Sequence, residues 1–234
     1  MYQLYSLLGI ELSPVSCREK LVSTAGGMIA IMLLILLNER VLHLSGAITL
    51  LGSMGASAVL LFAVPHGQLS QPWPVLGGHV FGALIGVSCA RWIAAPEMAA
   101  ALAVGLSIGM MHQLKCLHPP GAATALSAVL GNGAIHEMGY SFVIIPVLVN
   151  CLMMLGIAVA FNMCFGWRRY PACLTVRKIP AVPETPSHED IVMALRSIDT
   201  FVDVSENDLI LLNRLLASGR VAGAADGRSA NSAP

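Results

Sequence analysis

Apolar residues fill the middle of the chain in long runs, and charged residues are concentrated towards its ends. From Val41 to Trp167 the formally charged side chains are limited to Arg91, Glu97, Lys115 and Glu137. A helix needs about 20 mainly apolar residues to cross the hydrocarbon core of a bilayer. The pattern therefore predicts an integral membrane protein with several spanning helices.

The runs predict long and short helices in alternation. Long runs cover about 20–40, 75–92, 98–114 and 140–167, a run at 46–65 is broken by glycines, and 121–130 is about half the length needed to span. The segment that begins at Gly55 (GASAVLLFAV) resembles the one that begins at Gly121 (GAATALSAVL). We therefore predict two repeats of helix, half helix and helix, at about 21–92 and 98–167. The alternative is that any two membrane helices rich in Ala and Gly look alike.

The expected fold is all-α, with four transmembrane helices and two broken or re-entrant half helices. Lys and Arg near the outer helix ends predict that both termini are cytoplasmic. Four crossings would place the loop 66–74, where prolines disfavour a helix, outside, and six crossings would place it inside. We favour four, because 121–130 is too short to cross alone.

The flanking segments differ from this transmembrane domain, which we place at 20–169. Residues 1–19 are expected to form a pre-helix rather than a cleaved signal. Residues 170–187 form a Pro-rich linker, and the spacing of apolar residues in 188–216 predicts a cytoplasmic pair of amphipathic helices. Residues 217–234 are rich in Gly, Ala and Ser, which is typical of disorder.

Composition narrows the class of protein. Hydrophobic residues make up 56% of the chain and charged residues 11%, where a soluble domain carries about 25% charge. This excludes a soluble domain, a disordered chain and a nucleic-acid binder. The six cysteines form no C-x-x-C pair, which favours free thiols over a disulfide framework or a zinc site. No cofactor and no metal site are expected.

The segment 116–126 (CLHPPGAATAL) carries the strongest chemical signal. A proline disfavours α geometry in the residue before it, so His118 and Pro119 should be extended, and Pro120 suits the first position of a helix. Unwound backbone inside a bilayer is tolerated where it is buried in protein or lines a polar cavity. Unpaired N–H groups and the helix dipole would attract an anion there, and small residues would let it approach the backbone.

The corresponding place in the first repeat offers small and hydroxyl residues. Two half-helix N-termini that face each other would form a small, neutral pocket that attracts an anion. The candidate substrate-binding residues are Ser53, Gly55, Ala56, Ser57, Lys115, His118, Pro119, Pro120, Gly121, Ala122, Thr124 and Asn150.

Several of these residues have an alternative structural role. His118 contacts an anion or closes a turn before two prolines; Lys115 supplies charge to a pathway or extends to the membrane interface. Asn150 lines a pathway or links helices, and the Thr124 hydroxyl can bond the backbone behind it.

Three further side chains are expected to act structurally. For Gln71 and His79 we favour capping and interfacial roles over substrate contact. His112 is not expected to form a metal pair with His118, because no third ligand lies near in sequence.

The sequence resembles the HPP family of integral membrane proteins. The likeness covers about residues 20–167 and is carried by His118-Pro-Pro, by Gly55-Ala-Ser-Ala-Val-Leu-Leu-Phe, by Leu69-Ser-Gln-Pro (family pattern L-A-Q-P) and by Gly77-Gly-His. The chain has PPGAAT where the family has PPAGAT, a swap of small residues. The resemblance implies four spans and, from plant chloroplast relatives, nitrite transport. In many bacterial members a helical linker like 188–216 leads into CBS domains.

Together these observations favour a passive or proton-linked transporter or channel for a small inorganic anion, with nitrite first and nitrate next. The alternative is a membrane regulatory module that acts through its C-terminal helical tail. An intramembrane enzyme would need a nucleophile–base or carboxylate pair, and the apolar core offers histidines and one lysine, so no enzymatic activity is expected.

The expected partners are the anion, the lipid bilayer and further copies of the chain, and the expected location is a bacterial inner membrane. Small residues at Gly105 and Gly109, and at Gly78, Gly82 and Gly86, predict close helix packing within or between subunits.

Overall fold

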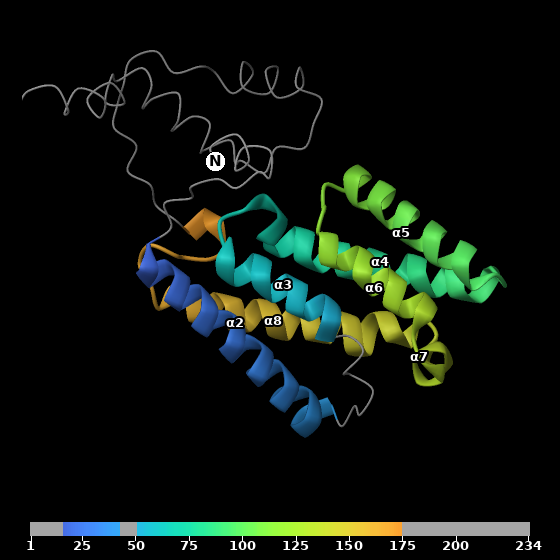
Figure 1. Cartoon of the computed structure of the whole chain (residues 1–234), viewed down its shortest axis with the longest axis horizontal. Coiled ribbons are helices and arrows are strands. Elements are labelled where there is room, and N and C mark those ends of the chain that lie inside the picture. The colour runs from blue at the N-terminus through green and yellow to red at the C-terminus, as the bar shows by residue number, and fades with distance from the viewer. Residues whose placement is uncertain (1–15, 43–50, 175–234) are drawn as a thin grey trace, which may run out of the picture.

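The computed structural model describes residues 16–42 and 51–174, and every regular element in these ranges is helical (Figure 1). The order is α2 (Cys17–Leu37), η1 (Asn38–Leu42), α3 (Leu51–Ala63), η3 (Gln68–Ser70), α4 (Pro72–Trp92), α5 (Pro96–Gln113), α6 (Pro119–Leu130), α7 (Gly133–Met138), η4 (Val143–Leu148), α8 (Val149–Met163) and η5 (Ala172–Leu174). Four expected segments lie outside these ranges: the pre-helix up to residue 15, the linker from 175 onward, the helix pair 188–216 and the tail 217–234.

Local sequence explains where the helices begin. The Ser16 hydroxyl caps α2 by accepting a hydrogen bond from the Glu19 N–H at 3.2 Å, so this helix begins before Lys20. The prolines at 72 and 74 do not bar a helix as expected. They lie in the first turn of α4, where a missing N–H costs no intrahelical bond.

Three of the described segments are long and apolar enough to span a membrane: Cys17–Arg40, Pro72–Trp92 and Val143–Met163. The last contains Pro146 and begins as the π-helical η4, because proline lacks the N–H that a regular α-helix would use. Two short helices lie where the half helices were predicted: α3, with 13 residues, lies within the run 46–65, and α6, with 12, covers 121–130. They begin near the middle of the molecule and run in opposite directions (Figure 1).

The loop between α3 and α4 lies beside the chain that follows α8. The Tyr170 hydroxyl donates to the Ser70 carbonyl at 2.8 Å, and the Ala172 N–H donates to Gln71 Oε1 at 3.0 Å. The favoured arrangement, with the loop 66–74 on the opposite side from the ends of the helical domain, is therefore wrong. The contacts agree with the six-crossing alternative, in which the loop and these ends share one side.

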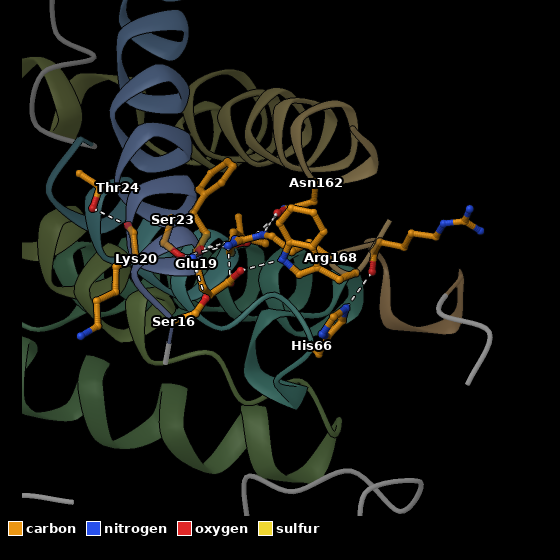
Figure 2. A network of polar contacts seen from close by, with 12 residues as sticks. Ser16, Glu19, Lys20, Ser23, Thr24, His66, Asn162 and Arg168 are labelled. Atoms are coloured by element: carbon orange, nitrogen blue, oxygen red, sulfur yellow. Dashed lines mark hydrogen bonds and ion pairs between the residues drawn. The ribbon is translucent and has the colours of Figure 1, made fainter. Parts of the chain in front are cut away.

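A buried arginine, Arg168, links three helices at the end of the molecule where the loop 66–74 lies (Figure 2). Arg168 forms an ion pair with Glu19 of α2, donates to the Phe62 carbonyl of α3, and bonds Ser23 Oγ and Asn162 Oδ1 at 3.0 and 3.2 Å. Arg168 is thus a link between α2, α3 and α8, rather than the exposed basic residue that the orientation rule assumed.

Glycines bring α4 and α6 into close contact at the centre of the fold. A Cβ at Gly82 would collide with the carbonyl group of Gly121, and a Cβ at Gly86 would lie 2.8 Å from Ala125 Cα. The predicted close packing at these positions is confirmed, and it occurs within the chain. A Cβ at Gly105 or Gly109 would meet no atom within 4 Å, so these two glycines on α5 serve no packing contact in the described part of the chain.

Candidate functional site

Four buried polar side chains form a continuous hydrogen-bonded chain where α3, α4 and α6 meet. Ser57 Oγ lies 2.8 Å from His79 Nε2 and 2.9 Å from His118 Nε2. His79 Nδ1 lies 2.7 Å from Thr124 Oγ1, and His118 Nδ1 lies 2.8 Å from the Leu69 carbonyl oxygen. All four side chains are fully buried. We call Thr124, His79, Ser57 and His118 the polar chain.

The direction of every hydrogen bond in the polar chain follows from one fixed end. The Leu69 carbonyl can only accept, so His118 Nδ1 carries a proton, and the neutral ring then offers Nε2 as an acceptor to the Ser57 hydroxyl. The Ser57 oxygen in turn accepts from His79 Nε2–H, and His79 Nδ1 accepts from the Thr124 hydroxyl. With both rings neutral, every polar atom of the chain has a partner.

The N-terminus of α6 differs from the expected cradle of free N–H groups. Pro119 and Pro120 have no N–H, and the Gly121 N–H donates to the His118 carbonyl at 2.8 Å. A Cβ at Gly121 would collide with Gly78 of α4, so this glycine serves helix packing and does not leave room for a ligand. The expectation that unpaired N–H groups and Gly121 receive the anion is wrong. The helix dipole remains, with its positive end beside His118.

The first-repeat candidates divide between two faces of α3. Ser57 belongs to the polar chain, and Ser53 is buried one turn earlier, where its carbonyl lies 3.2 Å from Ser57 Oγ. Gly55 faces a surface groove of about 320 Å³ between α2 and α3, and Ala56 is exposed. The structure therefore brings Ser57 to His118 and leaves Gly55 and Ala56 outside the polar chain.

A recess of about 280 Å³ lies next to the polar chain. It is lined by Leu69, Met111, His112, Lys115 and Leu117, among others. Lys115 is exposed at the end of α5 with a φ of 53°, and the Trp73 indole N–H donates to the Leu114 carbonyl beside it at 3.0 Å. Leu69 lines the recess and also bonds His118, so the recess adjoins the His118 end of the polar chain.

The remaining α6 candidates have mixed surroundings. Pro120 and Thr124 are buried, Ala122 is half-buried and Pro119 is exposed. Thr124 Oγ1 also lies 3.3 Å from the Pro120 carbonyl, and because the hydroxyl has one proton, the expected bond to the backbone is an alternative to the bond with His79. Among residues 16–42 and 51–174, no three or more His, Cys, Asp and Glu side chains are grouped so that they could hold a metal ion.

Asn150 belongs to a separate buried pair. Its Oδ1 accepts from Asn38 Nδ2 at 2.6 Å, and its Nδ2 donates to the Pro146 carbonyl at 2.7 Å. The pair joins the end of α2 to the start of α8. The π-helical segments η1 and η4 lie at these two places. This geometry favours the helix-linking role for Asn150 over contact with the polar chain.

Replacing Asn150 with leucine is expected to destabilise the protein by about 1–2 kcal/mol, because Asn38 then loses a buried partner. In the double variant with Asn38→Leu the coupling energy should be about 0.5–1.5 kcal/mol, the range for hydrogen bonds between membrane helices. Unfolding in mixed micelles measures both. Strict additivity of the two substitutions would show that the pair contributes nothing.

Sequence reasoning missed the role of His79. It was assigned a capping or interfacial role, yet it is fully buried and bonds two hydroxyls. The available signal was the Gly77-Gly78-His79 run. Two adjacent glycines in a membrane helix imply close approach of another helix, and a histidine beside them must then find a buried partner.

The fold and this site define a class: a helical integral membrane domain with a neutral polar chain enclosed between two short helices and the long helix α4. The transmembrane region of the HPP family matches residues 12–171, and the chain belongs to that family.

Two transmembrane proteins of Dictyostelium discoideum are similar to the chain. One is 39% identical over 153 residues, which cover 64% of this chain and 49% of the relative; the other is 41% identical over 126 residues, which cover 52% and 44%. The chain thus spans about half the length of the curated relatives it matches. Because they come from a eukaryote, they lend no support to the expected bacterial membrane. No solved structure matches the chain.

Proposed function

We propose that this HPP protein is a transporter or channel for a small inorganic anion, with nitrite as the first substrate and nitrate next, and that it carries out no covalent chemistry. The observation that carries the proposal is the recess lined by Lys115 and His112, which adjoins His118 and the positive end of α6.

The anion's route begins at Lys115. An exposed ammonium group in a recess raises the local concentration of anions, and leucine side chains on the same wall favour partial loss of hydration water. Beyond the recess the polar chain is neutral and contains no carboxylate, which suits a weakly held monovalent anion. Asn150 lies outside this route.

Replacing Lys115 with glutamine is expected to lower the initial rate of nitrite uptake into proteoliposomes about 3- to 10-fold at low ionic strength, with a smaller difference at high salt. Lys20→Gln is the matched control, because Lys20 is also exposed but lies at the start of α2, outside the recess. Nitrate, chloride and formate measured in parallel define the selectivity. Equal rates for the two variants would contradict the assigned entry.

A further inference from the structure

The polar chain has the form of a proton relay. We propose that it passes one proton between His79 and His118 through the Ser57 hydroxyl, and that this proton moves together with the anion. The inference rests on the proposed anion transport and specifies its coupling ion. It starts from the two contacts of Ser57 Oγ, at 2.8 and 2.9 Å, to the Nε2 atoms of two different imidazoles.

The transfer needs no movement of heavy atoms. When His79 is protonated, its Nε2–H bond breaks as a new O–H bond forms on Ser57, and the original O–H bond of Ser57 breaks as an N–H bond forms on His118 Nε2. Ser57 ends with one proton, His79 becomes neutral and His118 becomes the cation. The net result is the transfer of one proton from His79 to His118 through the Ser57 hydroxyl.

Each hydroxyl also has a second acceptor for the state in which its imidazole is charged. When His118 is protonated while His79 keeps its Nε2–H, both Nε2–H groups donate to Ser57 Oγ, and the Ser57 proton can turn to the Ser53 carbonyl at 3.2 Å. After a transfer from His79, the Ser57 proton instead donates to His79 Nε2. When His79 is the cation, the Thr124 proton can turn to the Pro120 carbonyl at 3.3 Å. A static network needs one set of hydrogen-bond partners. The polar chain has a complete set of partners for each position of the proton.

Charge explains why the proton and the anion should move together. A lone cation inside a membrane domain is costly, and the positive end of α6 beside His118 raises that cost further. A monovalent anion that arrives from the recess cancels the charge. The groups bonded to the two rings are hydroxyls from α3 and α6 and the Leu69 carbonyl. The Met111 sulfur from α5 lies 3.5 Å from the backbone nitrogen of His118.

Titratable neighbours lie at the margin of the polar chain. The Cys116 thiol packs against Gly77 of α4, and His112 and Lys115 share the recess with Leu69. The His118 end is therefore the end nearest to the recess, and a proton is exchanged there when water replaces the Leu69 carbonyl at His118 Nδ1.

The test measures anion and proton movement in the same proteoliposomes with an internal pH dye. An inward gradient of nitrite, and separately of nitrate, is applied at pH 7.5, and the signal of protein-free vesicles is subtracted because free nitrous acid crosses lipid. The wild-type chain should take up about one proton per anion. Ser57→Ala should lower coupled uptake by at least ~10-fold, and Ser57→Thr, which keeps the hydroxyl, should restore it.

Matched variants separate the relay from a structural role. Ser107→Ala removes another fully buried serine hydroxyl, bonded at 2.6 Å to the Ala103 carbonyl, and should behave as the wild type. Thr124→Val keeps the shape of the side chain and should also lower the uptake. Each variant is first shown to be monodisperse in detergent.

Three results would overturn a claim, and they are distinguishable. Nitrite uptake without proton movement overturns the coupling and leaves anion transport standing. Coupled uptake at the wild-type rate in Ser57→Ala overturns the relay. Uptake of nitrite and nitrate no faster than in empty vesicles overturns the proposed function itself.

Discussion

Replacing Arg168 with methionine is expected to destabilise the helical domain by about 3–5 kcal/mol, the usual cost of breaking a buried ion pair by removing one partner. The Arg168 side chain is 1% exposed, and its guanidinium bonds Glu19, Ser23, Phe62 and Asn162, so its loss removes contacts to three helices at once (Figure 2). Burial lowers the pKa of Arg168 from its ordinary value, and the nearby Glu19 carboxylate partly offsets this, so the charge is retained. Thermal unfolding in detergent gives the measurement.

Arg40→Met provides the matched control, because Arg40 is exposed in η1, beyond the far end of α2, and its replacement should change stability by less than about 0.5 kcal/mol. Adding Glu19→Gln to Arg168→Met should cost less than the two single changes together, since the carboxylate no longer lacks a partner. If Arg168→Met and Arg40→Met unfold at the same temperature, Arg168 does not fasten the domain as described.

Placing a methyl group at Gly82 is expected to destabilise the protein by about 1–3 kcal/mol and to reduce anion transport strongly. The new Cβ would collide with the carbonyl group of Gly121, so α4 and α6 must separate. His79 lies on α4 and Thr124 on α6, joined at 2.7 Å, so separation of the helices also breaks the polar chain.

Gly105→Ala is the control for this substitution. It changes the same residue type in the neighbouring helix, but its Cβ would meet no atom within 4 Å. Alanine is the better helix former by about 1 kcal/mol, so this variant should be as stable as the wild type or more stable. Both variants are compared by unfolding and by nitrite uptake. Equal loss in the two would contradict the packing that places His79 against Thr124.

Local features were predictable from the sequence because they depend on neighbouring residues. The break before α6 follows from two consecutive prolines, and the close approach of α4 follows from Gly78, Gly82 and Gly86 at helical spacing. The short α6 follows from the length of its apolar run, and the break of the run 46–65 follows from its glycines.

Features that depend on distant partners were not predictable. His79 bonds residues 22 and 45 positions away, and no local pattern reports such contacts. Arg168 resembles an ordinary basic residue at a membrane edge until the fold brings Glu19 to it. The side on which the loop 66–74 lies was misjudged for the same reason, because Tyr170, which bonds Ser70, is 100 residues away.

Nitrite uptake into proteoliposomes with wild-type protein, His118→Ala and Pro120→Leu tests the central claim most directly. His118 closes the polar chain beside the recess, and Pro120 lies in the first turn of α6, which holds His118 in place. The account predicts uptake well above empty vesicles for the wild type and at least ~10-fold slower uptake for both variants. Unchanged nitrite uptake in the two variants would contradict it.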